Sequence, residues 1–486
     1  MSGMSLKPAQ MLFCCTLAFS VARTLPALVR FYKWFVSSDL EIAKHRGYGQ
    51  TGSKAYGFIP SPKLSVPAMA GSGVAFALCL LLCNVSFETD VPRPLLLCLA
   101  LVFYHLYFSQ VYCEAHVGAH VTVMIPPTLI FLALSPALDT AQTSEDSEML
   151  KLQAGAFTAW LVKAVIASSY CSAGVSKICS SIQSRRFWWD GRTLQASIFE
   201  ALLLCRPGMH TSFGVPTPFA HQMQVFAYRR PKLLLAPLSF LSVAVEALAP
   251  LALLLPPSFA SPAFAAVGLS FHYGIAYLQN VDFVSWWGPS YAFFMLDPAG
   301  SWEIGPLASA RASFALAPCR TSLAVGYLAA HLFFMLVLHF FPSVEMLPFS
   351  CFPMFKHLKD LFDPSMRKWF WLSAKPHATG TLKNYCFPFC RPQTVLVEEL
   401  DQLPFRYLLF GHGGSDAETL YSNFEVSDEL RGLLDEMRNC CCRSDSSAAE
   451  DLLSTLFEAQ ELFEKTTEKI GTSYLSMKLD DTLLGS

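Results

Sequence analysis

Apolar windows of roughly 20 residues recur through residues 1–350, and they constrain the fold of this chain more than any other feature. A helix of about 20 apolar residues crosses the ~30 Å hydrocarbon core of a bilayer. Only 15% of the 486 residues are charged, whereas a soluble chain has about 25%. The sequence therefore predicts an all-α, polytopic transmembrane helical bundle with a small C-terminal soluble region.

Nine apolar segments are candidate spans, and we expect about 8–9 spans because one segment, 283–297, is short. The segments are 9–35, 65–85, 94–113, 117–138, 154–178, 233–256, 260–280, 283–297 and 321–341. The first segment continues through Arg23 and Arg30, so we expect it to remain as an anchor rather than to be cleaved as a signal peptide.

The composition changes near residue 342 and predicts three regions. Residues 1–345 form the transmembrane bundle, 346–374 an amphipathic, interfacial segment, and 375–486 a soluble, mostly helical tail. Within the tail, leucines recur at helical spacing between 425 and 470, which predicts one or two amphipathic helices. The three cysteines that begin at Cys440 are candidates for S-acylation if they are cytosolic, and an unmodified cluster is the alternative.

Loop charges suggest an orientation. The connection after the first span and the connection at 180–232 are both basic, whereas 139–150 is acidic. The bias of lysine and arginine toward the cytosol would place both basic connections there. The net charge of −2 gives no reason to expect a nucleic-acid partner.

One predicted span carries three polar side chains at intervals of seven residues. Lys163, Tyr170 and Lys177 lie on one helical stripe, beside the small residues Ala173 and Gly174. Ionisable groups inside a membrane usually face the bundle interior. The alternative is that Lys177 reaches the headgroup region with its long side chain, because the span ends nearby.

Other spans add further polar residues. His116 and His120 share a helical face, but no further ligands accompany them, so histidines satisfied by neighbouring helices are expected and no metal is predicted. His272 lies in a later span, and a single carboxylate, Glu246, interrupts the span before it. Because such groups need partners in hydrocarbon, we predict that they share an internal polar site.

Four short motifs suggest a family. "AGVSKI" followed by "WWDGRTL" resembles the signature of the HTTM-type membrane domain, which is shared with the vitamin K-dependent gamma-glutamyl carboxylases. "FHYGIAYLQNVDFVSWWGPSYAFF" looks like a family segment that begins with Phe-His, "SQVYCEAH" resembles a stretch that ends in Asn-Asn-His, and "FSCFPMF" resembles an FPMF element after the last span. The resemblance covers roughly residues 10–355, with a longer spacer before the tryptophans and Glu-Ala in place of Asn-Asn.

The resemblance implies a chemistry. Lys177 occupies the position of the lysine base that deprotonates vitamin K hydroquinone, and Ser176 replaces the lysine before it. His116 matches the histidine that stabilises the developing alkoxide, and His272 matches the Phe-His histidine. The implied catalytic residues are therefore Lys177, His116 and His272, and a quinone or hydroquinone is the implied lipid-phase small molecule. The implied location is the endoplasmic reticulum or another endomembrane.

Two points separate this chain from the carboxylases. Their site opens toward the lumen, whereas the loop charges place the Lys177 end of its span toward the cytosol. They also carry a large lumenal domain, whereas roughly 130 residues follow residue 355 here without a clear β-rich pattern, so protein gamma-carboxylation is not expected. Two classes remain: a membrane enzyme or redox protein that acts on a lipid-phase substrate, and a non-enzymatic carrier or assembly factor with structural polar clusters.

Overall fold

The computed structural model of the protein describes the residues that carry its helices. These are 6–37, 64–85, 92–114, 123–139, 145–202, 211–212, 215–254, 257–279, 282–296, 305–338, 428–440 and 447–470. Nearly all of them are helical, and the one exception with regular structure is a pair of antiparallel two-residue strands, β1 (Thr211–Ser212) and β2 (Val215–Pro216). The predicted all-α class is confirmed for this part of the chain.

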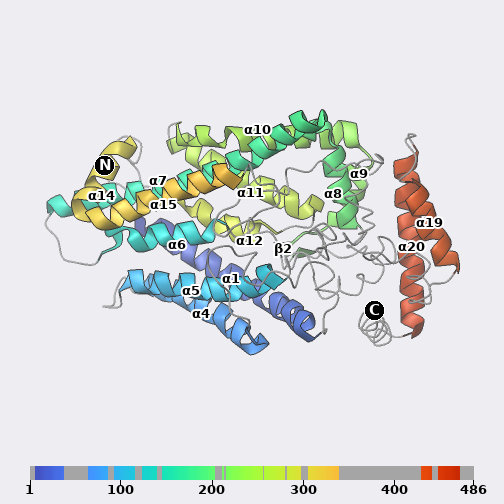
Figure 1. Cartoon of the computed structure of the whole chain (residues 1–486), viewed down its shortest axis with the longest axis horizontal. Coiled ribbons are helices and arrows are strands. Elements are labelled where there is room, and N and C mark those ends of the chain that lie inside the picture. The colour runs from blue at the N-terminus through green and yellow to red at the C-terminus, as the bar shows by residue number, and fades with distance from the viewer. Residues whose placement is uncertain are drawn as a thin grey trace.

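Most of the helices run along the long axis of the molecule (Figure 1). These are α1 (Leu6–Ser37), α4 (Val66–Val85), α5 (Arg93–Glu114), α6 (Ile125–Leu134), α7 (Glu145–Ser184), α10 (Ala236–Leu248), α11 (Pro257–Gln279) and α15 (Pro318–Leu338). The helix α14 (Gly305–Leu316) precedes α15. A π-helical turn, η4 (Pro231–Leu235), leads into α10, and a 3-10 turn, η5 (Ala249–Leu253), follows it.

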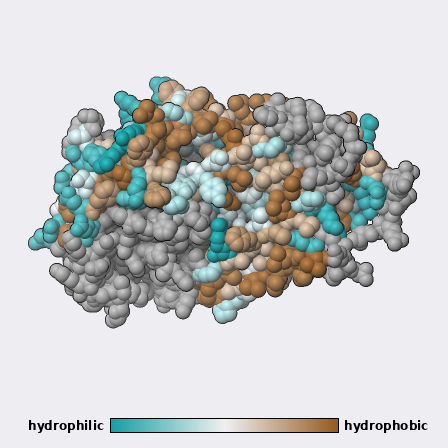
Figure 2. All heavy atoms as spheres, turned by 180° about the vertical axis from the view of Figure 1, so that it is seen from behind, coloured by the Kyte–Doolittle hydropathy of each residue, from teal (hydrophilic) through white to brown (hydrophobic). Residues whose placement is uncertain are grey.

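Five of the described helical stretches are long and apolar enough to cross a membrane: Leu6–Pro26, Val66–Val85, Glu148–Ser184, Pro231–Leu253 and Pro318–Val337. Their outward faces carry large apolar side chains, among them Leu82, Leu241 and Leu336, which are 50%, 56% and 61% exposed. Figure 2 shows hydrophobic residues spread over broad areas of one face of the molecule. Such areas are costly in water and favourable in lipid, so the chain has the character of a membrane protein. The count of 8–9 spans stays a prediction.

The helix α7 is the centre of the bundle. It has 40 residues, which gives a length of roughly 60 Å, and it contacts α10, α14, α15 and α6. Gly174 allows the closest of these approaches, because a Cβ atom at this position would lie 2.5 Å from the backbone nitrogen of Ala247, at the end of α10. The small residues beside Lys177 thus let a second helix pack tightly against α7.

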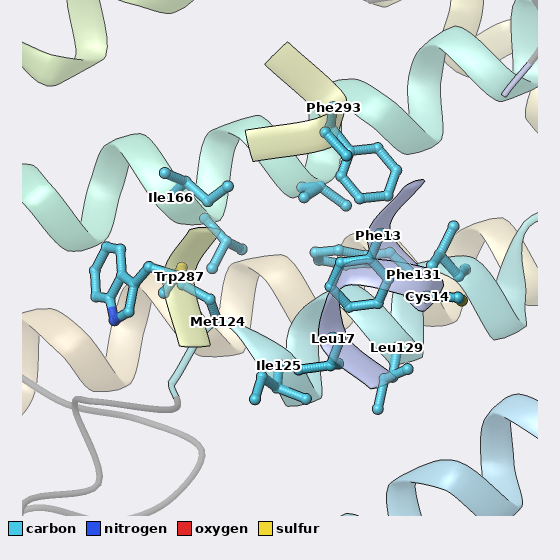
Figure 3. Close-up of a cluster of buried hydrophobic side chains, with 14 of the residues drawn as sticks. Phe13, Cys14, Leu17, Met124, Ile125, Leu129, Phe131, Ile166, Trp287 and Phe293 are labelled. Carbon is cyan, nitrogen blue, oxygen red and sulfur yellow. The ribbon is translucent and has the colours of Figure 1, made fainter. Parts of the chain in front are cut away.

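Apolar and aromatic side chains fill the space between the helices. Figure 3 shows Phe13 and Leu17 of α1, Leu129 of α6, Ile166 of α7 and Phe293 in one cluster. The rings of Phe13 and Phe293 have centroids 5.9 Å apart. This core joins the first helix of the chain to segments almost 300 residues later.

The predicted short span at 283–297 is a chain of three short helices, namely α12 (Val284–Trp287), the 3-10 turn η6 (Gly288–Tyr291) and α13 (Ala292–Met295). Asp282 accepts a hydrogen bond from the backbone N–H of Ser285 at 2.9 Å and so caps the start of α12. Arg23 of α1 bonds to the Ser285 hydroxyl and lies 3.7 Å from Asp282. An ion pair therefore ties this irregular segment to the first helix.

Four helices form one end of the molecule (Figure 1). They are α8 (Arg192–Leu202), α9 (Ala220–Tyr228), α19 (Asp428–Cys440) and α20 (Ala448–Ile470). Leu452, Leu456 and Met437 pack with Phe199 of α8 and Tyr228 of α9 in a second apolar cluster. Arg229 forms an ion pair with Glu450 across the same contact. The tail helices predicted between 425 and 470 are thus present, and they dock on α8 and α9.

Candidate functional site

The three polar residues of the α7 stripe are all buried. Lys163, Tyr170 and Lys177 are 5%, 3% and 1% exposed. Seven residues of α-helix rise by roughly 10 Å, so the stripe places three polar contacts at three successive levels along α7. Each level draws its partners from segments later in the chain.

Lys177 meets a carboxylate from α10. Its ammonium nitrogen lies 2.7 Å from Glu246 Oε1 and 2.6 Å from Glu246 Oε2, and it donates to the hydroxyl of Ser242 at 2.8 Å. Ser242 and Glu246 are four residues apart, so they lie on one face of α10. The pair is fully enclosed, because Lys177 is 1% and Glu246 is 2% exposed.

Aromatic rings complete this level. The ammonium of Lys177 lies 4.4 Å from the ring centroid of Trp188 and 5.9 Å from that of Phe271. A cation is attracted to the faces of such rings. A lysine that extended to the headgroups would have an exposed ammonium group, so the snorkelling alternative does not fit this geometry. Lys177 is therefore an internal charged group, and its partner is Glu246.

The middle level is a hydrogen-bonded chain of three rings. The Tyr170 hydroxyl lies 2.7 Å from His272 Nε2 and also bonds to the hydroxyl of Tyr291. Gly268 gives Tyr291 its place, because a Cβ atom there would overlap the Tyr291 hydroxyl. Phe283 stacks on the imidazole with ring centroids 5.4 Å apart. His272 is 3% exposed.

One ring nitrogen in this chain of rings has no hydrogen-bond partner among the described residues. Within the described part of the molecule, His272 Nδ1 is buried and has no hydrogen-bond partner. If Nε2 accepts from Tyr170, then Nδ1 carries an unused N–H donor, and if Nε2 donates, then Nδ1 is an unused acceptor. In both arrangements the imidazole can bind one further polar group, and burial makes an unfilled position costly.

The third level is simpler. Lys163 donates to the hydroxyl of Ser261 at 3.3 Å, and its ammonium lies 5.6 Å from the ring centroid of Phe294. Both partners come from segments that follow α10, as His272 and Tyr291 do, whereas Ser242 and Glu246 lie on α10 itself. The stripe on α7 is therefore covered by residues 242–294 along its whole polar length.

The structure describes two of the predicted site residues and not the third. The structure brings Lys177 and His272 to neighbouring levels on the same face of α7, roughly 10 Å of helix apart, and Phe271 contacts both levels. His116 and His120 lie outside the described residues, as does the "FSCFPMF" stretch at 349–355. The shared site of His116, Lys177 and His272 thus stays a prediction.

Sequence reasoning noted Glu246 only as a lone polar residue and did not pair it with Lys177. It did not single out Tyr291 or Ser242 at all. Glu246 was visible as a carboxylate in an apolar run, but Tyr291 lies in a Phe- and Trp-rich segment, where a tyrosine carries no signal of its own.

No group of three His, Cys, Asp or Glu side chains within the described ranges is arranged to hold a metal ion. Comparison with protein-family models, curated proteins and solved structures finds no match to this chain. The proposed chemistry of the site therefore rests on its own residues.

Proposed function

We propose that the protein is a multi-pass membrane enzyme of the HTTM-like type in which the Lys177–Glu246 pair takes the proton of a lipid-phase hydroquinone. The observation that carries the proposal is the enclosed ammonium–carboxylate contact at 2.6–2.7 Å between α7 and α10. The resemblance of "AGVSKI" to the lysine segment of the quinol-oxidising carboxylases supports it. The proposal includes 8–9 spans and residence in the endoplasmic reticulum or another endomembrane.

The pair can handle a proton in two steps. A carboxylate in direct contact with an ammonium can accept its proton, which leaves a neutral amine on Lys177 and a neutral acid on Glu246. The amine can then accept the proton of a quinol hydroxyl. At the end, Lys177 is again an ammonium, Glu246 holds one proton, and the substrate is a quinolate whose charge lies beside the ammonium. The unused ring nitrogen of His272 offers a hydrogen bond to the same class of molecule.

Turnover of a soluble naphthohydroquinone by the purified full chain in proteoliposomes tests this function. We expect quinone formation under air with the parent protein and its loss in Lys177→Arg and Glu246→Gln, because guanidinium does not release a proton at accessible pH and an amide cannot accept one. Arg320→Gln is the control, since Arg320 pairs with Asp139 where both side chains are about one third exposed. Parental turnover in a folded Lys177→Arg protein would falsify the proposal.

A second class, a non-enzymatic carrier or assembly factor, is favoured by one observation. The ammonium of Lys177 already has Glu246 and Ser242 as partners, as a purely structural pair would. This class predicts that no hydroquinone is oxidised by the parent protein and that replacing both members of the pair with apolar residues preserves assembly. Mass spectrometry of lipid extracts from the purified protein separates the two classes, because an enzyme of quinols should retain a quinone.

A further inference from the structure

The short helix α9 exposes an apolar face at the end of the bundle. Phe219, just before the helix, is 72% exposed, and Met223 and Phe226 are 46% and 53% exposed. Their spacing of four and three residues places them on one side. The opposite side, with Ala220, Gln224 and Tyr228, is buried. Large apolar side chains gathered on one face of a surface helix are typical of a helix that lies in a membrane interface.

This face is continuous with two membrane-length helices. The chain passes from α9 into the stretch Pro231–Leu253, where Leu233 is 72% exposed, and α7 ends at Ser184 with Ile182 71% exposed. Gly191, which follows α7, has a φ of +85° and lies against the backbone of Pro231 and Ala236. The segment after α7 therefore packs closely on the start of the Pro231–Leu253 stretch. The exposed apolar residues of α9 therefore lie near the start of the Pro231–Leu253 stretch, which α9 contacts through η4.

Basic residues surround this level. Residues 182–192 and 219–233 contain six arginines and lysines and one acidic residue, Asp190. Arg229 is engaged by Glu450 of α20. Arg230 lies over the ring of Phe226 with its guanidinium carbon 3.8 Å from the centroid, and Lys232 is exposed beside the apolar face. Cations directly beside interfacial apolar side chains are placed to meet negative headgroups.

We propose that α9 and the basic residues that follow it, Arg230 and Lys232, form a docking surface for anionic phospholipid headgroups. Phe219, Met223 and Phe226 enter the boundary between headgroups and acyl chains, and the basic side chains contact the phosphates and carboxylates above it. The leaflet concerned is the one in which α7 ends. Anionic lipids mark the cytosolic leaflet, so this surface places the Lys177 end of α7 on the cytosolic side.

Native mass spectrometry of the full chain, released from nanodiscs of mixed phosphatidylcholine and phosphatidylserine, measures which lipid is retained. We expect retained phosphatidylserine in excess over its share of the nanodisc. Replacing Arg230 and Lys232 together with Gln should lower that preference, by roughly fivefold for each removed charge. The control is Arg311→Gln, an exposed arginine on α14 that is remote in sequence from α9. Equal retention of the two lipids by the parent, or an unchanged preference in the double variant, overturns the proposal.

Two further experiments distinguish a phospholipid from other molecules that could cover this surface. Inorganic phosphate at high concentration should leave the retained phosphatidylserine in place, and its displacement would identify a simple anion site instead of a lipid surface. Benzoylphenylalanine at position 226 should cross-link to phospholipid on illumination. A cross-link to another segment of this chain, or to a second copy, would mean that protein covers this face and that the lipid proposal is wrong.

Discussion

At the residue scale, Glu246 compensates the buried charge of Lys177. Removal of one member of a buried ion pair leaves a charge without compensation, whereas replacement of both members by apolar residues is often neutral or stabilising. The geometry of the pair, with both carboxylate oxygens within 2.7 Å of the ammonium, makes this distinction testable. The sequence alone does not pair Lys177 with Glu246 and so does not predict this cost.

We predict that Lys177→Met lowers the free energy of unfolding by about 3–5 kcal/mol. The double variant Lys177→Met with Glu246→Met should recover most of this loss, because no buried charge remains. Thermal and denaturant unfolding in detergent measures both. Arg320→Gln is the matched control and should cost at most about 1 kcal/mol, since the Arg320–Asp139 pair is partly exposed. A double variant as unstable as the single one would contradict the assignment of this pair.

A second residue-level prediction concerns Gly174. An added methyl group would meet the backbone of Ala247 at 2.5 Å, where neither helix can yield easily. Gly174→Ala should therefore destabilise the protein by about 1–3 kcal/mol. Gly71→Ala on α4 is the control, because a Cβ atom there meets nothing within 4 Å, and alanine should gain up to about 1 kcal/mol of helix propensity. The difference in melting temperature between the two variants is the measurement.

At the element scale, a histidine lies in the contact between α9 and α20. The ring of His221 lies 5.4 Å from that of Phe457, and burial lowers the pKa of His221 from its usual value. A released α20 would expose His221, whose pKa would then rise toward about 6.5. The undocked state therefore binds more protons, and docking should weaken as the pH falls below about 6.5.

Hydrogen–deuterium exchange of residues 448–462 in the full chain at pH 7.5 and 5.5 measures this effect. We predict faster exchange at the lower pH and a smaller pH dependence in His221→Gln, which cannot take up the proton. Glu450 pairs with Arg229 in the same contact and is unchanged in this variant. If the variant keeps the full pH dependence, His221 is not its source.

The elements also show what can be read from the sequence. The predicted segments 65–85 and 94–113 match α4 and α5 within two residues, because an unbroken apolar run has few alternatives to a helix. The segment 283–297, predicted as a short span, is a series of short helices, since Gly288 and Pro289 fall in the middle of it. The helix α14 was not predicted, because its composition of alanine and serine lacks an apolar run.

Only part of the candidate site could be predicted from the sequence. Lys177 and His272 stand out because polar residues in apolar runs are visible in the sequence, and both are buried, Lys177 on α7 and His272 on α11. Their partners were not predicted, because Glu246 follows Lys177 by 69 residues and His272 follows Tyr170 by 102. Periodicity within one helix cannot specify which later helix covers it.

At the scale of the whole molecule, the Lys177–Glu246 pair and the hydrogen-bonded rings of Tyr170, His272 and Tyr291 are enclosed by helices whose outer faces are apolar. Lys177 and Glu246 are 1% and 2% exposed, and in the proposed function their substrate comes from the bilayer. A hydroquinone that gives its proton to the pair must leave Glu246 protonated.

Infrared difference spectroscopy on the full chain tests this step most directly. Adding the naphthohydroquinone without oxygen should produce a carbonyl band of a buried carboxylic acid, and Glu246→Gln should abolish it, whereas Arg320→Gln should keep it. No carboxylic acid band in the parent, or the same band in Glu246→Gln, would contradict the role of the Lys177–Glu246 pair as the proton acceptor.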